Sequence, residues 1–341
     1  MSDFINTIDV VGDNALIDSI IDKSITEIAD DTVTSIGSKV FYQCPSLTKV
    51  NFPVATSIDE YAFHNSAITT ADFNSATSIG AYAFYYCSNL TTANFPVATE
   101  VSANAFKGCT YLSELTLGLI NIPSTMFKQF SYLTKVNFPA ATSVEERAFE
   151  SCSRLTTLNF PVATSIGNNV FNGCKALTTV DFPSVTSVGG GILVNCTSLT
   201  TANFPVATSV GGSAFYNCYS LTSVNFPVAT SIGAHSFNGC TKLTTVDFPS
   251  VTSVETSAFQ NCSALSTLIL RKTDAICTLS STIALQGTPI ASGTGYIYVP
   301  AVLKSQYEQA SNWSNFAARF RDLESFTVDG TTTGALDETK I

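Results

Sequence analysis

The chain has 341 residues, 45% of them hydrophobic and 12% charged, which is enough apolar material for a folded core and excludes a globally disordered chain. Its net charge is −10, and its 16 Lys and Arg residues are dispersed without forming a basic block, which argues against partners such as nucleic acid or an anionic membrane surface. The sequence shows neither an apolar run of about 18 residues nor a positive segment leading into an apolar one. We therefore expect no membrane insertion and no signal peptide, with synthesis in the cytoplasm.

Residues 1–40 are predicted to form an N-terminal cap. Asp13 and Asn14 suit the start of a short helix, and Leu16, Ile17 and Ile20 would give it an apolar face. Residues 25–28 and 34–37 then match, in degenerate form, the unit that repeats in the rest of the chain. A cap is needed because the end of a repeat array would otherwise expose its core.

From residue 41 to residue 270 the chain repeats with a period of 22 residues, shortened to 21 twice. One column of the repeat consists of Phe41, Phe63, Phe84, Phe106, Phe127, Phe149, Phe171, Phe215, Phe237 and Phe259, with Leu193 in the remaining place. A second column consists of Phe52, Phe73, Phe95, Phe138, Phe160, Phe182, Phe204, Phe226 and Phe248, with Leu117 and Leu270 in register. Because one unit cannot bury its own apolar face, we expect about ten units to stack as the coils of a solenoid.

The best-preserved unit shows how each coil should be built. In Val224-Asn225-Phe226 the side chains alternate between inward and outward positions, as in a half-buried strand, and Pro227 ends the strand because it has no amide hydrogen to donate. The later Ile232-Gly233 segment would return the chain from the opposite wall. Strands from successive coils, about 4.8 Å apart, would form one parallel β-sheet face over a continuous core.

The pattern x-Ala-Phe-x-x-Cys-x-x-Leu-x-x-Val-x-Phe-Pro resembles the BspA-like leucine-rich repeats of bacterial surface proteins and of related phage-encoded proteins, over about residues 25–270. The resemblance implies a leucine-rich-repeat solenoid, and a parallel β-helix with coils of similar length remains an alternative. Three positions after the strand Phe, Ala55, Ala98 and Ala229 replace the usual Asn or Cys. We expect the Thr-Ser pair that follows, such as Thr56 and Ser57, to supply the missing ladder.

The sequence changes character after Leu270. Residues 296–300 are predicted to form a strand and residues 301–323 a helix, because Leu303, Tyr307, Trp313 and Phe320 recur with helical periodicity. A strand followed by a helix is similar to the module that ends many BspA-like phage proteins. We therefore predict a C-terminal capping module over residues 271–326 and a flexible or attachment tail over residues 327–341.

Nine of the ten cysteines occupy one column of the repeat: Cys44, Cys87, Cys109, Cys152, Cys174, Cys196, Cys218, Cys240 and Cys262. Ser66 and Phe130 take the same position in two coils, and no Cys-x-x-Cys or zinc-ligand spacing occurs. Buried free thiols are favoured over a metal or redox ladder. His64 and His235 belong to no catalytic constellation. The sequence therefore predicts no catalytic residue, cofactor or metal site, and a protein that is not an enzyme.

The outward positions of the predicted strands form a polar ribbon. They are filled by Asn51, Asp72, Asn94, Asn137, Asn159, Asp181, Asn203, Asn225 and Asp247, preceded by Thr92, Thr157, Thr179, Thr201 and Thr245. The ribbon could consist of ladders in which the amides and hydroxyls satisfy one another, or it could be a binding face for a glycan or a partner protein. Calcium bridging is disfavoured because single carboxylates rarely supply six oxygen ligands.

Two coils depart from the repeat, and such coils often carry specificity in repeat proteins. Residues 112–133 replace the Thr/Asn pattern and are one residue short, and residues 189–194 replace the Ala-Phe return. Several tyrosines flank the Cys column and could form a contact stripe: Tyr85, Tyr86, Tyr111, Tyr132, Tyr216 and Tyr219. Ordinary sequence drift is the alternative explanation for these departures.

These features predict a binding or adhesion module that presents a surface. The resemblance implies a virion-associated phage protein that recognises a host-surface protein or glycan and can contact other virion proteins. A purely structural decoration or assembly protein is one alternative. A bacterial leucine-rich-repeat interaction protein, which would stay in the cytoplasm, is another.

Overall fold

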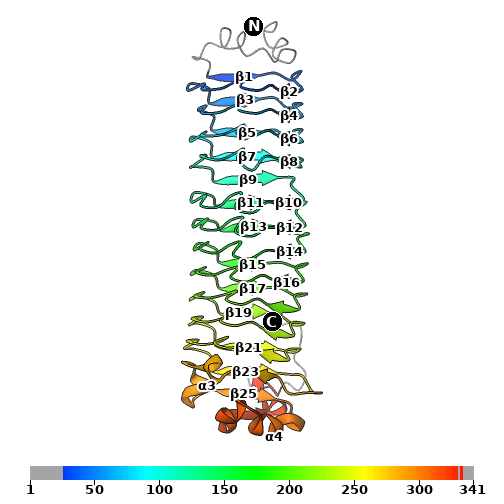
Figure 1. Cartoon of the computed structure of the whole chain (residues 1–341), viewed down its shortest axis with the longest axis vertical. Helices are drawn as coiled ribbons and strands as arrows, with labels where there is room; N and C mark the ends of the chain where they lie inside the picture. The colour runs from blue at the N-terminus through cyan, green and yellow to red at the C-terminus, as the bar shows by residue number, and fades with distance from the viewer. Residues whose placement is uncertain (1–25, 329–330, 333–341) are drawn as a thin grey trace. The chain divides into compact units, whose positions relative to one another are not determined.

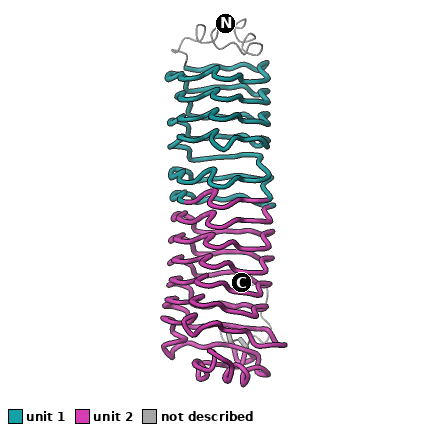
Figure 2. Tube along the Cα trace, in the orientation of Figure 1, with its two compact units in different colours: residues 1–142, 151–162 teal, residues 143–150, 163–341 magenta. Residues whose placement is uncertain are grey.

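The computed structural model describes residues 26–328 and 331–332. The chain divides into two compact units, which Figure 2 distinguishes by colour. Unit 1 consists of residues up to 142 together with residues 151–162, and unit 2 of residues 143–150 together with residues 163 onward. Each unit is built from stacked coils that contribute one longer and one shorter strand (Figure 1).

The longer strands form parallel ladders within each unit. Unit 1 contains β1 (Glu27–Ala29), β3 (Lys49–Asn51), β5 (Thr70–Asp72), β7 (Thr92–Phe95), β9 (Glu114–Leu117), β11 (Lys135–Asn137) and β13 (Thr157–Asn159). Of these, β1 pairs with β3, and β5 to β13 form a five-stranded sheet. Unit 2 contains β15 (Thr179–Asp181), β17 (Thr201–Asn203) and β19 (Ser223–Asn225) in one sheet, and β21 (Thr245–Phe248) and β23 (Thr267–Leu270) in another. The predicted parallel sheet is confirmed.

A second parallel ladder of two-residue strands lies on the return side of the coils. In unit 1 it consists of β2 (Ser35–Ile36), β4 (Ser57–Ile58), β6 (Ser78–Ile79) and β8 (Glu100–Val101), followed along the chain by β10 (Asn121–Ile122). In unit 2 it runs through β12 (Ser143–Val144), β14 (Ser165–Ile166), β16 (Ser187–Val188), β18 (Ser209–Val210), β20 (Ser231–Ile232), β22 (Ser253–Val254) and β24 (Thr278–Leu279). Strands β1 to β24, at two per coil, give twelve coils, slightly more than the ten expected. The difference arises because the degenerate coils at both ends keep the strand pattern.

The two Phe columns form the core of each unit, as predicted. Phe84 and Phe106 in unit 1 are fully buried and stack at 5.3 Å with an interplanar angle of 5°. Phe215 and Phe237 in unit 2 stack at 5.1 Å and 1°. A ring repeated at the spacing of the coils buries its faces against its own copies, so the same residue can fill each successive layer of the core.

Threonine hydroxyls form ladders along both units, as expected from the alanines that replace the usual Asn or Cys. Thr56 Oγ1 donates to the carbonyl oxygen of Thr34 at 3.1 Å, and Thr230 Oγ1 donates to that of Thr208 at 3.1 Å. A second threonine ladder, which the sequence analysis missed, precedes the longer strands, where Thr200 Oγ1 donates to Thr178 O at 2.8 Å. These bonds satisfy carbonyl oxygens at the bends of the coils.

The return side contains left-handed backbone positions four residues apart. In one coil they are His235 (φ 58°) and Gly239 (φ 81°). Between them, the Phe237 amide donates to Ala258 O of the next coil at 2.8 Å. The coils approach so closely at Gly233 that a Cβ there would lie 2.7 Å from the Gly212 nitrogen. This contact explains the Gly in the Ile-Gly pair of the repeat.

The C-terminal module adds β25 (Tyr296–Val299) and β26 (Phe320–Asp322) to the sheet of β21 and β23. The predicted strand is confirmed, whereas the single helix predicted over residues 301–323 is wrong. Helix α4 (Ala301–Gln309) ends at Ala310, which is extended, and Asn312 before the next helix adopts φ 62° and donates its side-chain amide to Leu279 O at 2.7 Å. The module also contains the short helices η1 (Thr282–Leu285), α3 (Pro289–Ser292), η2 (Trp313–Arg319) and η3 (Leu323–Ser325).

Aromatic side chains of the C-terminal module hold the segment around Cys277. Trp313 Nε1 donates to Cys277 O at 2.6 Å, and the Cys277 amide donates to the Tyr307 hydroxyl at 2.8 Å. Both rings are buried. The helical apolar residues seen in the sequence therefore cover the end of the core even though they do not lie on one helix.

Some predictions concern residues outside the described part of the chain. The N-terminal helix expected near residues 14–21 is one, and most of the predicted tail is another. Within that tail, β27 (Thr327–Val328) pairs antiparallel with β28 (Thr331–Thr332). The segment boundaries at residues 40, 270 and 326 remain predictions.

Candidate interaction surface

The outward positions of the longer strands carry the predicted polar ribbon in both units. In unit 1 these residues are Asn51, Asp72, Thr92, Asn94, Asn137, Thr157 and Asn159, and all are exposed or half-buried. In unit 2 they are Thr179, Asp181, Thr201, Asn203, Asn225, Thr245 and Asp247, with similar exposure. Strand register aligns like residues, so that Asp181 pairs with Asn203 and Asn203 with Asn225.

The amides of the ribbon donate to one another from coil to coil. In unit 2, Asn225 Nδ2 donates to Asn203 Oδ1 at 2.7 Å, and Asn203 Nδ2 donates to Asp181 Oδ1 at 2.7 Å. In unit 1, Asn159 Nδ2 donates to Asn137 Oδ1 at 2.6 Å. The predicted ladder is confirmed for these pairs. A donor engaged in this way is not free to recognise a ligand unless the ladder bond breaks.

The ribbon of unit 2 is closed by an ion pair at Asp247. Arg271 Nε lies 2.9 Å from each carboxylate oxygen of Asp247, and Arg271 Nη2 lies 2.8 Å from Oδ2. Both side chains are largely buried, which strengthens the pairing. Asp247, one of the predicted ribbon residues, therefore already has a partner within the chain.

In unit 1 the amide ladder is interrupted at β9, in the irregular coil of residues 112–133. Thr116 occupies the ribbon position there, so Asn137 has no side-chain carbonyl of the preceding coil to receive its Nδ2. Among the residues that the structure describes, no hydrogen bond engages Asn137 Nδ2. Lys135 and Glu114 lie side by side with Nζ and Oε2 4.0 Å apart. The threonine at position 116 thus leaves the side-chain amide of Asn137 without a hydrogen-bond partner among the described residues.

A depression of about 390 Å³ lies over this interruption. The polar side chains that line it are Asp72, Asn94, Glu114, Thr116, Lys135 and Asn137, together with threonines of β5 and β7. Beside it, Asn94 Nδ2 donates to Asp72 Oδ1 at 2.8 Å and to Asn74 Oδ1 at 3.2 Å. The sequence analysis did not single out Asn74. The signal was present, because Asn74 replaces the proline that normally follows the strand Phe.

Exposed aliphatic residues follow several longer strands of unit 1, three of them directly after a Phe-Pro pair and one, Ile120, three residues after Leu117. This apolar ridge consists of Val54, Val97, Ile120 and Val162. Ile120, in the irregular coil, is the most exposed of the four at 56%. The sequence carried a signal for three of these residues, since Val54, Val97 and Val162 directly follow a proline, but none for Ile120. Exposed aliphatic side chains beside a polar strip are typical of protein contact surfaces.

The second irregular segment, residues 189–194, is irregular in sequence but not in packing. Ile192 and Leu193 are fully buried in the places of the usual Ala and Phe. Leu193 O accepts the Cys218 thiol at 3.2 Å, as the Phe carbonyls do in other coils. Gly191 takes the left-handed position with φ 64°. This segment preserves the core and offers no separate surface feature.

The cysteines are all buried and free, as predicted. In each unit the thiols donate to carbonyl oxygens of the preceding coil, as Cys109 does to Phe84 O at 3.0 Å and Cys196 to Phe171 O at 3.2 Å. Burial raises the pKa of Cys152 and of Cys218 to about 12. Thiols that stay protonated in an apolar core are poor nucleophiles and poor metal ligands.

The histidines occupy different environments. His235 is exposed, as predicted. His64 is half-buried between the rings of Tyr42 and Tyr85, and desolvation lowers its pKa below the ordinary value. In residues 26–328 no group of three or more His, Cys, Asp or Glu side chains is placed to hold a metal ion.

No helix within the described ranges is long and apolar enough to span a membrane.

Comparison with solved structures finds leucine-rich repeat proteins, and the first of them, with a TM-score above 0.5, has the same fold. A leucine-rich repeat protein from Bacteroides ovatus is 21% identical, covering 87% of this chain and 83% of that one with a TM-score of 0.53. A leucine-rich cell surface protein from Faecalibacterium prausnitzii is 24% identical, covering 85% and 81% with a TM-score of 0.39. A leucine-rich repeat protein from Eubacterium ventriosum is 22% identical, covering 77% and 83% with a TM-score of 0.41. None of the curated protein sequences matches the chain.

Comparison with protein families identifies the repeat itself. The BspA-type leucine-rich repeat region, in six copies, matches residues 12–119, 99–219 and 208–282. These ranges together span most of the chain, and they decide between a leucine-rich-repeat solenoid and a parallel β-helix. The chain belongs to the BspA-type leucine-rich repeat family.

Proposed function

We propose that this leucine-rich repeat protein is a non-catalytic binding module whose ligand contacts the longer strands of unit 1 at the irregular coil, residues 112–133. The observation that supports the proposal is the interruption of the amide ladder at Thr116, which leaves Asn137 Nδ2 without a partner beside Glu114 and Lys135. In the regular coils of unit 2 the corresponding amides of Asn203 and Asn225 donate to the preceding coil. A ligand at the interruption can form hydrogen bonds without first breaking bonds within the protein.

The surface around the interruption favours a protein partner over a glycan. The apolar ridge reaches its greatest exposure at Ile120, and an opposite-charge pair lies in the depression beside it. Aliphatic contacts together with charged groups of both signs are characteristic of protein interfaces. A glycan remains the second ligand class, because the depression is lined by hydroxyl, amide and carboxylate groups that can bind sugar hydroxyls.

The sequence resemblance suggested more specific roles, namely a phage virion location, host recognition or adhesion, and a decoration or assembly function. Each would use the same exposed surface, and each remains a prediction. An interaction protein of a bacterial cell is the simplest role that is compatible with the family.

Removing the groups at the interruption should weaken binding more than removing groups of the regular ladder. We expect the triple variant Glu114→Ala/Lys135→Ala/Asn137→Ala to bind at least about tenfold more weakly, because it loses one hydrogen-bonding amide and two charges. The control is Asp181→Ala/Thr201→Ala/Asn203→Ala in the regular ladder of unit 2, for which we expect a change below about twofold. The measurement is binding of the labelled chain to a panel of bacterial envelopes, immobilised envelope proteins and immobilised glycans.

Equal weakening by both triple variants would show that the binding surface does not centre on the irregular coil. No binding at micromolar protein, together with stoichiometric recovery of the chain in capsid or tail particles, would replace the binding function by the structural one. Binding confined to the immobilised glycans would assign the surface to the second ligand class.

A further inference from the structure

The return side of unit 1 carries a second surface that the proposed function does not use. Six rings form a contiguous ring patch there, consisting of Tyr42, Tyr61, His64, Tyr82, Tyr85 and Tyr86. Tyr42, His64 and Tyr85 stack face to face with ring centroids 4.7 and 5.3 Å apart. Tyr82 and Tyr86 meet the Tyr85 ring edge-on at 5.2 and 4.4 Å. Tyr61 completes the patch by stacking on Tyr82 at 5.0 Å.

The fold does not require these rings. The Phe stacks beneath them are complete, and the coils of unit 2 place a ring, Tyr216, only once at the position of Tyr42, His64 and Tyr85 and none at the position of Tyr61 and Tyr82 except the imidazole of His235. Where unit 1 has Tyr61 and Tyr82, unit 2 has Arg147, Asn169, Gly191, Ser213, His235 and Ser257. All of these positions share the left-handed backbone conformation. An aromatic residue at such a position gains nothing from the backbone, so the concentration of rings in unit 1 calls for a different explanation.

The rings are accessible and already ordered. The Tyr86 side chain is 53% exposed, and the other five rings are half-buried. Because the rings hold one another by stacking, little side-chain freedom is lost when a partner covers them. Tyrosine is favoured in protein-binding surfaces for this reason, since it offers a large contact area at low entropic cost.

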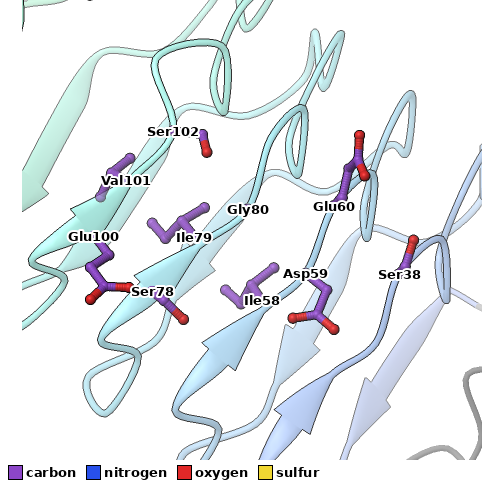
Figure 3. A pocket seen from close by; sticks show the side chains of 10 residues that line it. All are labelled: Ser38, Ile58, Asp59, Glu60, Ser78, Ile79, Gly80, Glu100, Val101 and Ser102. Carbon is purple, nitrogen blue, oxygen red and sulfur yellow. The ribbon is translucent and has the colours of Figure 1, made fainter.

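Three carboxylates border the ring patch. Asp59, Glu60 and Glu100 line a depression of about 560 Å³ formed by successive coils, and Figure 3 shows them with Ser78 between them. All three are exposed. None of them forms an ion pair with any residue in the described part of the chain. Glu60 directly precedes Tyr61, so the depression and the ring patch are continuous.

Two lysines lie next to this surface, Lys39 and Lys107, and the carbonyl oxygen of Lys107 accepts the Tyr86 amide at 2.9 Å. Lys39 Nζ lies 6.0 Å from the centre of the Tyr61 ring, and it pairs with none of the three carboxylates. Burial keeps His64 neutral near pH 7, because desolvation lowers its pKa. The surface therefore combines aromatic faces and edges with three carboxylates that form no ion pair within the described residues.

We propose that the ring patch and the adjoining carboxylates form a docking surface for a polypeptide segment that carries arginine. A guanidinium group can bind a carboxylate through two hydrogen bonds and can also lie on an aromatic ring, so it matches both components of the surface. Lysine matches only the charge. A second copy of this chain is a poor occupant because it carries the same net charge of −10.

The test uses fluorescein-labelled peptides of alternating Arg and Gly, Lys and Gly, or Glu and Gly, titrated with the full chain. We expect the Arg peptide to bind more tightly than the Lys peptide and the Glu peptide not to bind. In Asp59→Asn/Glu60→Gln/Glu100→Gln we expect the Kd for the Arg peptide to rise at least about tenfold. The charge-matched control is Asp31→Asn/Glu308→Gln/Glu324→Gln, which removes three negative charges elsewhere and should change the Kd by less than about twofold.

A second pair of variants tests the rings. Tyr85→Ser/Tyr86→Ser should weaken binding of the Arg peptide by about fivefold or more, whereas Tyr216→Ser/Tyr219→Ser in unit 2 should leave it unchanged. Equal effects of the two charge variants would mean that the peptide responds only to net charge, which would overturn the proposal. Equal affinity for the Arg and Lys peptides would do the same, and so would no binding at millimolar peptide. Self-association that is lost in the Tyr85/Tyr86 variant would assign the patch to a second copy instead.

Discussion

Replacing Phe215 by Ala is expected to lower the free energy of unfolding by about 3–5 kcal/mol. The Phe215 ring is fully buried, stacks on Phe237 at 5.1 Å and meets Phe226 edge-on at 5.9 Å. Each coil of a solenoid contacts only the coils on either side of it. A cavity in one layer of the core therefore cannot be filled by side chains of distant coils. Guanidinium unfolding followed by circular dichroism measures the loss.

The matched control for Phe215→Ala is Tyr219→Ala in the same coil. The Tyr219 side chain is 45% exposed, and removing it should cost no more than about 1 kcal/mol. Similar losses for the two variants would mean that the Phe column does not form a closely packed core. A separate early transition in Phe215→Ala alone would instead indicate that unit 2 unfolds as a part of its own, and the comparison would then use that transition.

Stability is expected to fall steeply with rising pH above about 9. Burial raises the pKa of Cys152, Cys218 and Cys277 to about 12 and that of Cys87 to about 11, from an ordinary value of 9.0. Because the pKa is higher in the folded state, the contribution of each thiol is intact below about pH 9. It is lost progressively as the pH rises toward 12, since only the unfolded chain releases these protons readily. At about pH 10.5 the loss is about 2 kcal/mol per thiol.

Free energies of unfolding measured under reducing conditions at about pH 8 and about pH 10.5 test this expectation. Cys218→Ala should show a pH-dependent loss smaller than that of the unchanged chain by about 2 kcal/mol. Leu221→Ala, which removes a buried group that does not titrate, should keep the full pH dependence even though it lowers stability at both pH values. An identical pH-dependent loss in Cys218→Ala and the unchanged chain would contradict the burial of this thiol in an apolar environment.

The repeat allowed the core and the longer strands to be predicted, because each buried position recurs many times in one column. A single Val-x-Phe alternation, such as that of Val224 and Phe226, is weak evidence for a strand, but its recurrence in successive units predicts the strand clearly. The two-residue strands were harder to predict. A Ser-Ile pair such as Ser231–Ile232 has too few residues to show any alternation, and its pairing depends on neighbouring coils.

The sequence did not predict structural features that occur in only one coil, because no repeated pattern points to them. Between α4 and η2 the chain turns at Asn312, whose side-chain amide donates to Leu279 O, 33 positions away. The free amide of Asn137 follows from a substitution in the preceding coil, at Thr116, and not from anything local to Asn137. The sequence did identify residues 112–133 as irregular, but which groups the irregularity would leave unengaged depended on strand register.

The sequence predicted which residue types lie on the surface of each unit, but not how these residues contact one another. The Asn and Asp residues of the ribbon were expected on one face, and the structure places them there, but most of their donors are engaged with each other. The tyrosines were expected as a stripe along the Cys column. Instead, six rings including His64 gather in the first coils of unit 1, because three positions of the repeat contribute to one patch.

The most direct test of the proposed binding function exchanges the irregular coil for a regular one. Replacing residues 107–127 by the sequence of residues 216–237 keeps the buried columns, because both segments follow a core Phe and end on one. The chimera should retain the circular dichroism spectrum and cooperative unfolding of the unchanged chain while losing at least about tenfold in affinity for the envelope component that the chain binds. A folded chimera that binds with unchanged affinity would contradict the assignment of the binding surface to this coil.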